Sequence, residues 1–387
     1  MKILHTSDWH LGHILYNYDR GVEQLSMLNQ MAEIVRTEQP DVFLLCGDVY
    51  HTSQPSATTQ TMFTNALVKI HQACPTMTII ATAGNHDSGI KHDIFKTPWR
   101  ALGVYTFGNL DRNDITQHII EIPDKGYVIA LPYINERNIP DNLFQQLLDI
   151  TQQRNSQSMP VIMTAHTTIR GCDFTGHDNT NDYSVGGIDY LDIEQLGHGY
   201  DYLALGHIHH QQFVHTGKHN VRYCGSPIPI AFDENYQHTV SIVEINQHGA
   251  EPAVRQIPID NPHPLVTIPT NGFATWDDAK SMLMQFPDDI EAYIRLNIEI
   301  TDFLPPNAKN EAEQIVADKK CRFCLFNTKR ISTKSNQCTT HLTINEFQTR
   351  QPIDIAQQYA ADKGVEFDDR LQQLFRQALE EIKTDIE

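Results

Sequence analysis

The chain has 387 residues, of which 40% are hydrophobic and 20% charged, enough for one large hydrophobic core with smaller units beside it. Its formal net charge of -19 argues against a protein that coats nucleic acid on its own, because contacts with phosphate dominate that kind of affinity. Any contact with DNA is therefore expected to be local, bridged by metal or shared with a partner.

Strand and helix patterns alternate along residues 1–261 and predict an α/β domain. A short apolar strand pattern at the N-terminus is followed by apolar residues at helical spacing, and Pro40 closes this helix before a second strand. A second helical pattern at residues 56–73 leads into a third strand that begins at Thr78. Half-buried strand patterns follow at residues 115–131, 211–215, 221–223 and 239–245. Together these patterns predict two packed sheets with helices outside.

Three prolines between residues 257 and 264 indicate a linker, and a smaller unit is predicted over residues 262–346. Its patterns give a β-α-β-α-β order, with strands at residues 265–268, 292–301 and 321–328 and helices at residues 276–286 and 307–317. Residues 347–387 are mostly helical in pattern. We therefore expect an α+β capping domain and a helical C-terminal segment after the first domain.

Neither a secretion signal nor a membrane segment is visible in the sequence. The N-terminus moves straight into a strand pattern, and no stretch approaches about 20 apolar residues. The seven cysteines are odd in number and scattered, unlike a disulfide framework. We expect a soluble protein of the cytoplasm, where thiols stay reduced, with no membrane partner.

Polar side chains follow five apolar strand patterns at the point where each strand ends. Open α/β sheets place their ligands at the carboxyl ends of their strands, so these side chains are expected to meet. They are Asp8, His10, Asp48, Asn85, His86, Asp87, His166, His207 and His209. Carboxylates, imidazoles and an amide in one place are the ligands of a pair of divalent cations about 3.5 to 4 Å apart, an arrangement that serves phosphoester hydrolysis. Each motif alone is weakly specific, and their combination in this order predicts the metal cluster.

The motifs D-x-H, G-D, G-N-H-D, H and G-H-x-H occur in the order typical of the calcineurin-like metallophosphoesterase family, which the chain resembles. The resemblance implies a β-sandwich flanked by helices. It implies that one metal ion is held by Asp8, His10, Asp48 and His209. It implies that the second ion is held by Asp48, Asn85, His166 and His207. Two manganese ions are expected, with magnesium as the alternative.

Within that family, residues 6–12, 47–50, 221–229 and 232–234 resemble the nuclease subunits of bacterial DNA repair complexes. This narrower resemblance implies hydrolysis of phosphodiester bonds at duplex DNA ends, in hairpins and in single strands, in repair, recombination and replication. It also implies a partner ATPase with a coiled coil. A homodimer within a heterotetramer is expected, joined through residues 56–73 and 93–102.

His86 is not needed as a metal ligand, and we assign it to the leaving oxygen as a proton donor or an electrostatic stabiliser, with Asp87 as a candidate to orient it. His51 is either a substrate-binding residue in the same groove or a solvated loop histidine. Two other functions stay open. One is a metallophosphatase for a small molecule or a phosphoprotein. Protein phosphatases of the family, however, carry a glutamate where Asp87 stands and an Asp-Arg-Gly after the bridging aspartate, a sequence that does not follow Asp48 in this chain. The other is an inactive scaffold, which the complete ligand set disfavours.

Two features of the C-terminal part allow alternative interpretations. Cys321, Cys324, Cys338 and His341 have spacing compatible with zinc, but residues three apart on a strand point to opposite faces. The second feature is an amphipathic helical stripe that packs either on the chain itself or in a groove of the partner ATPase. The stripe consists of Leu371, Leu374, Phe375, Ala378, Leu379 and Ile382.

Overall fold

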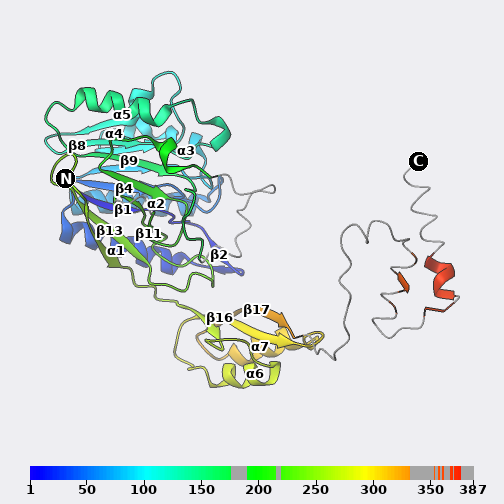
Figure 1. Ribbon diagram of the computed structural model, residues 1–387. Helices are drawn as coiled ribbons and strands as arrows, with labels where there is room; N and C mark the ends of the chain where they lie inside the picture. The colour runs from blue at the N-terminus through cyan, green and yellow to red at the C-terminus, as the bar shows by residue number, and fades with distance from the viewer. Residues whose placement is uncertain are drawn as a thin grey trace. The chain divides into compact units, whose positions relative to one another are not determined.

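The computed structural model describes residues 1–175, 190–214 and 219–331, with residues 353, 356, 357, 360, 367, 368 and 370–375 nearer the C-terminus (Figure 1). The chain divides into two compact units, Met1–Ile331 and Ser332–Glu387. The first unit contains two six-stranded sheets, one three-stranded sheet and one two-stranded sheet. No helix of the described residues is long and apolar enough to cross a membrane.

The first six-stranded sheet has the order β14-β13-β1-β4-β5-β6. Its strands are β1 (Lys2–Thr6), β4 (Val42–Cys46), β5 (Thr78–Thr82), β6 (Val104–Phe107), β13 (Thr239–Glu244) and β14 (Ala253–Pro258). Strands β1, β4, β5 and β6 are parallel, while β13 and β14 are antiparallel to their neighbours. The carboxyl ends of β1, β4 and β5 therefore lie side by side at one edge of the sheet.

The second six-stranded sheet has the order β11-β12-β10-β9-β8-β7. Its strands are β7 (Ile119–Ile122), β8 (Gly126–Ala130), β9 (Val161–His166), β10 (Tyr202–Gly206), β11 (Gln212–Phe213) and β12 (Val221–Tyr223). Strands β8, β9, β10 and β12 run parallel. The functional strands β9 and β10 are therefore neighbours whose carboxyl ends also meet.

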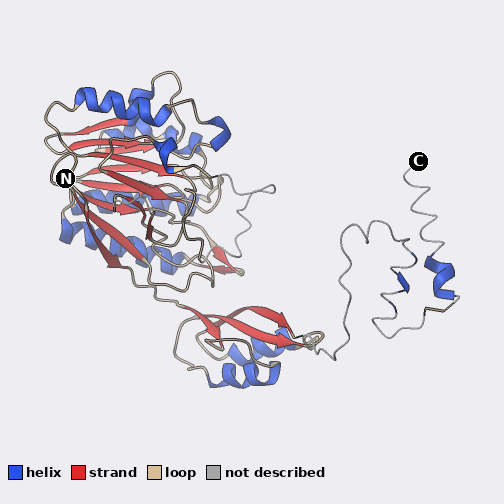
Figure 2. Ribbon diagram, in the orientation of Figure 1, coloured by secondary structure: helices blue, strands red, loops and turns tan. Residues whose placement is uncertain are grey.

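The two sheets pack face to face with helices outside, as Figure 2 shows. Side chains alternate along each strand, so Ile3, Val42 and Leu44 face the other sheet. Leu4 and Phe43 instead pack among the apolar residues of the helices that cover the first sheet. These helices are α1 (Gly21–Glu38) and α2 (Ala57–Ala73), and α5 (Leu143–Arg154) covers the second sheet. The predicted sandwich flanked by helices is confirmed.

Short elements complete this part of the fold. They are β2 (Ile14–Leu15), β3 (Tyr18–Asp19), α3 (Gly89–Ile94), α4 (Lys96–Arg100) and the 3-10 helices η1 (Ile115–His118), η2 (Glu136–Asn138) and η3 (Ile193–Leu196). Helix α2 begins where the sequence predicts, because the hydroxyl of Ser56 accepts the N–H of Thr59 at 3.1 Å.

Residues 265–330 form a parallel three-stranded sheet with two helices, which we call the cap region. Its elements are β15 (Leu265–Ile268), α6 (Trp276–Gln285), β16 (Tyr293–Ile300), α7 (Ala308–Val316) and β17 (Arg322–Arg330), in the β-α-β-α-β order expected. Both helices contribute buried side chains to one apolar cluster with the strands. The division of the chain at residue 262 stays a prediction.

Much of the predicted C-terminal segment lies outside the described residues. Residues 370–375 are helical, with Leu371 and Leu374 exposed by 40% and 56%. The remaining members of the predicted stripe, Ala378, Leu379 and Ile382, lie outside the described residues. Cys338 and His341 lie outside as well, so the zinc site stays a prediction.

Candidate metal centre

The structure brings the five strand ends together. Asp8 and His10 follow β1, Asp48 follows β4, and Asn85 follows β5 in the first sheet. In the second sheet β9 ends at His166 and β10 is followed by His207 and His209. Because the two sheets face each other, their side chains approach from both sides of the sandwich.

One group of possible ligands consists of Asp8, His10 and His209, all buried, with ligand atoms within 4.8 Å of one another. The Nε2 atoms of His10 and His209 lie 3.1 Å apart. The carboxylate of Asp8 accepts the backbone N–H of His207 at 3.1 Å and the hydroxyl of Ser7. These bonds hold the carboxylate in place beside the histidine pair.

The second group consists of Asp48, His166 and His207. Oδ2 of Asp48 lies 3.3 Å from Nε2 of His166, and Oδ1 of Asn85 lies 3.0 Å from both His166 Nε2 and His207 Nδ1. The same Oδ2 atom of Asp48 is 3.7 Å from Nε2 of His10 in the first group. Asp48 therefore stands between the two groups, where a shared ligand has to be.

This donor set fits two divalent cations. Imidazole nitrogens, carboxylates and an amide oxygen suit manganese, zinc and related ions, and converging buried donors are costly unless they bind a common partner. Burial tends to raise the pKa of Asp48, but His166, His10 and His86 outweigh it and hold that pKa well below its ordinary value. Burial lowers the pKa of His10 far below its ordinary value. A charged carboxylate and a neutral imidazole are the forms that bind metal, so these two shifts favour binding. At His166 burial is outweighed by the Asp48 and Asp8 carboxylates, which raise its pKa to about 9, so an ion that binds there displaces a proton.

His86 and His51 lie beside the first group. The backbone N–H of His86 donates to Asp48 at 2.9 Å, and its ring stacks on that of His51 with centroids 5.6 Å apart. Nδ1 of His51 is 3.3 Å from Nδ1 of His10. His10, His51 and His86 also lie close enough together to hold an ion, so the assignment of His86 and His51 to substrate rather than metal stays a prediction.

Asp87 holds the two loops of the first sheet against each other. Its carboxylate accepts the backbone N–H groups of Val49 at 3.0 Å, Tyr50 at 2.9 Å and Gly84 at 2.9 Å. These bonds join the loop that carries Asp48 to the loop that carries His86. The role of Asp87 in orienting His86 stays a prediction. The backbone bonds of Asp87 would act on His86 by fixing the loop that carries it.

The loops take unusual backbone conformations at the ligand positions. Asp8, His10, Asp48 and His207 have positive φ angles of 53°, 44°, 50° and 95°. A β-carbon on Gly84 would lie 2.1 Å from Oδ1 of Asp48. The glycine of the G-N-H-D motif is therefore required by close approach to the central carboxylate.

Glu234 is a residue of the site for which the motifs predict no role. Its Oε1 lies 2.8 Å from Nδ1 of His209, and the residue is buried. The only signal in the sequence was its place in the 232–234 motif, because a separation of 25 residues from His209 follows no local periodicity.

A family model described as calcineurin-like phosphoesterase matches residues 1–211, more than half of the chain. The matched residues include all five strand ends and every predicted metal ligand. The fold expected from the motifs is therefore confirmed by a comparison that covers every predicted metal ligand.

Several relatives are named as the SbcD component of the nuclease SbcCD. The protein from Rhodobacter capsulatus is 30% identical over 302 residues, which cover 71% of this chain and 73% of that protein. The Escherichia coli K12 protein is 32% identical over 273 residues, covering 62% and 65%. The Bacillus subtilis protein is 28% identical over 325 residues, covering 79% and 80%. The chain therefore belongs to the calcineurin-like phosphoesterase family and, within it, to the group of SbcD proteins.

Proposed function

We propose that the chain is a metal-dependent DNA nuclease that hydrolyses phosphodiester bonds with two divalent cations, most suitably manganese. The observation that carries the proposal is the position of Asp48 between two groups of converging donor atoms. The relatives named as nucleases support DNA as the substrate. As the sequence resemblance implies, we propose exonuclease action on duplex ends and endonuclease action on hairpins and single strands, in repair and recombination.

The side chains divide the work of hydrolysis between them. Bound ions in such a site lower the pKa of water and draw charge from the phosphate oxygens. We propose that the ions are held by Asp8, His10, His209, Asn85, His166 and His207, with Asp48 shared. His86 Nδ1 lies 3.0 Å from the carbonyl oxygen of His51, and its N–H donates there. A second proton on Nε2 is the one that we assign to the leaving oxygen of the substrate.

The alternative is a metallophosphatase for small molecules or phosphoproteins. Purified protein with manganese, given linear duplex DNA, hairpin DNA, single-stranded DNA and p-nitrophenyl phosphate in parallel, separates the two. We expect cleavage of DNA that far exceeds release of p-nitrophenol. Rapid release of p-nitrophenol with intact DNA would favour the phosphatase, and no turnover of any substrate would favour the scaffold.

We further propose that the nuclease works with an SbcC-like ATPase, in the cytoplasm, where the described cysteines, all free thiols, would stay reduced. A chain of net charge -19 is expected to contact DNA only locally, through bound metal or with the help of a partner. We propose a homodimer within a heterotetramer, because the predicted contact region near residues 93–102 exposes Ile94, Phe95 and Leu102 by 61%, 54% and 42%. A mass measured by light scattering at twice the chain mass is expected.

The C-terminal stripe is the proposed docking segment for the ATPase. A chain that ends at Lys363 is expected to fold and to cut single-stranded DNA, but to lose co-purification with the SbcC-like ATPase and ATP-stimulated cutting of duplex ends. Leu374→Asp should reproduce the loss, and Gln373→Asp, at a neighbouring exposed position, should not. If the shortened chain aggregates or loses its cooperative melt, the stripe belongs to the core of the chain itself.

A further inference from the structure

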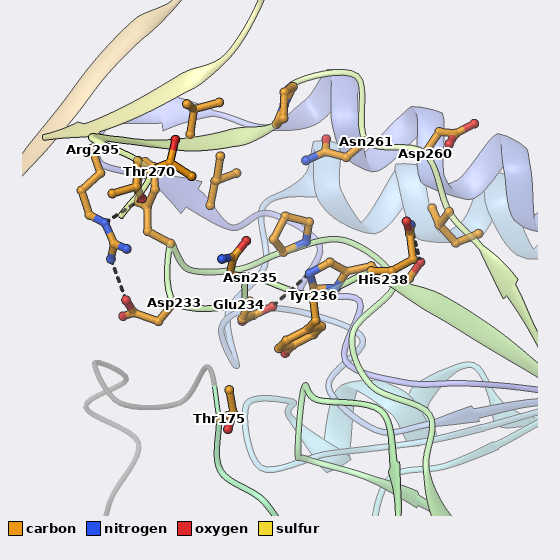
Figure 3. Close-up of a pocket in the computed structure, with 18 of the residues that line it drawn as sticks. Thr175, Asp233, Glu234, Asn235, Tyr236, His238, Asp260, Asn261, Thr270 and Arg295 are labelled. Carbon is orange, nitrogen blue, oxygen red and sulfur yellow. Dashed lines mark hydrogen bonds and ion pairs between the residues drawn. The ribbon is translucent and has the colours of Figure 1, made fainter. Parts of the chain in front are cut away.

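Three consecutive side chains connect the cap region to the metal centre. They belong to the turn at residues 232–234, in which the N–H of Glu234 bonds to the carbonyl of Ala231 at 3.3 Å and the N–H of Asn235 to the carbonyl of Asp233 at 2.9 Å. Figure 3 shows Asp233 reaching Arg295 on one side while Glu234 lies on the other. These two backbone bonds tie the three side chains to one short loop.

Arg295 of β16 holds the outer side of the turn. Its Nη1 donates to Asp233 at 2.6 Å, its Nε donates to Thr267 at 3.1 Å, and its guanidinium lies 5.3 Å from the centre of the Phe232 ring. The side chains of Arg295 and Asp233 are only 14% and 20% exposed, so water screens this pair less than a surface pair. Phe232 itself is buried in a cluster with Leu15 and Tyr293.

Glu234 holds the inner side of the turn against the metal centre. Its side chain is fully buried, its Oε1 accepts Nδ1–H of His209 at 2.8 Å, and its Oε2 accepts the hydroxyl of Ser226 and the N–H of Ile230, both at 3.1 Å. With the proton on Nδ1, the lone pair of His209 is on Nε2, the atom that faces His10. A carboxylate that fixes a histidine in this way strengthens its binding of metal.

A cavity of about 780 Å³ separates much of the turn from the cap region. It is lined on one side by residues 232–238 and on the other by residues 264–267, Arg295 and Asn297. Close packing therefore does not hold these two surfaces together over their whole length. The ion pair and the ring contact of Arg295 attach the turn to the cap region beside the cavity, together with the packing of Phe232 against Tyr293.

We propose that the 232–234 turn couples the cap region to the metal site of Asp8, His10 and His209, with Glu234 as a positioning residue. The inference rests on the proposed two-metal function and names a means of regulating it. When the cap region holds Asp233, Glu234 keeps His209 aimed at the metal. When a DNA substrate or the ATPase shifts the cap region, the affinity of this site for metal changes, while the site of Asn85, His166 and His207 does not. Coupling of this kind is reciprocal, so bound metal also steadies the turn and β16.

The experiment compares manganese binding by the full-length wild type and five variants, using calorimetry and the electron paramagnetic resonance spectrum of the manganese pair. Glu234→Ala is expected to lower the affinity for one of the two manganese ions by roughly 10-fold to 100-fold. Glu234→Gln, which still offers an acceptor to His209, should recover part of the loss. Arg295→Gln and Asp233→Asn should lower the affinity for the same ion by roughly 3-fold or more. Lys280→Gln, which breaks a 3.1 Å ion pair with Glu311 inside the cap region, is the matched control and should change neither ion.

Hydrogen exchange distinguishes this coupling from a merely structural role of Arg295, which would not alter the effect of manganese on amide exchange. Manganese should slow amide exchange in residues 231–235 and in β16 of the wild type. In Arg295→Gln this effect should disappear, although the melting temperature of the variant equals that of the wild type. If Arg295→Gln and Asp233→Asn bind both ions as the wild type does, the coupling is wrong, although the nuclease proposal stands. If the wild type binds no pair of ions and cuts no DNA, the proposed function fails, and the coupling fails with it.

Discussion

The variant Asp48→Ala is expected to lose both metal ions and at least about 1,000-fold of its DNA cleavage, while it remains folded. Asp48 Oδ2 faces His10 in one group of ligands and His166 in the other, so its removal deprives both ions of a charged ligand. The preceding strand β4 is buried along its whole length and does not depend on the carboxylate. Calorimetry with manganese, cleavage of linear duplex DNA and a thermal melt measure the three quantities.

Asp124→Ala is the matched control for Asp48→Ala. Asp124 also has a positive φ, of 59° against 50° for Asp48, but it lies exposed in a turn. Both variants therefore place alanine in the left-handed region, and a difference between them reports the carboxylate rather than the backbone. Near-normal manganese-dependent cleavage by Asp48→Ala would contradict the two-metal assignment.

His86→Ala is expected to keep both metal ions and to lower the rate of cleavage by roughly 100-fold to 10,000-fold, as the loss of a general acid does. Its ring lies 4.9 Å from that of His10, close to the site without being needed in either predicted ligand set. Rates should be measured on an ordinary DNA strand and on a strand whose leaving oxygen is replaced by sulfur. Because sulfur leaves without a proton, the variant should regain most of its rate on the second substrate.

The opposite result for His86 is also informative. His10, His51 and His86 lie together in a geometry that accommodates an ion. Loss of one manganese ion from His86→Ala would make His86 a ligand, and an equal defect on both substrates would remove it from the leaving oxygen. His219→Ala, at an exposed histidine away from the ligand groups, controls for the loss of an imidazole.

The strands of the site were predictable because their signal is local. In β4 five buried residues precede Gly47 and Asp48, and parallel strands bring such ends together whatever the rest of the chain does. The edge strand β14 was missed because its side chains are mostly exposed and show no alternation. It is a strand because of its backbone bonds with β13, which a local pattern does not contain.

Helix α5 was also missed, although its pattern was present in the sequence. Leu143, Phe144, Leu147 and Leu148 recur at helical spacing between glutamines, and all four are buried against the second sheet. The bonds that position the site are a different case. Asp87 accepts three backbone N–H groups, and Glu234 pairs with His209. Both contacts depend on how distant loops meet. Residue type alone carries no information about such contacts.

The left-handed backbone at the ligand positions implies a cost in thermal stability. An L-residue other than glycine pays about 1 kcal/mol or more in that region, and four predicted ligands adopt it. Selection for stability alone would favour glycine at Asp8, His10, Asp48 and His207, and selection for metal binding forbids it. Bound ions offset this cost, because an ion that binds only the folded chain stabilises that chain by mass action. Chelation should lower the melting temperature of this protein by removing the stability that the bound ions supply.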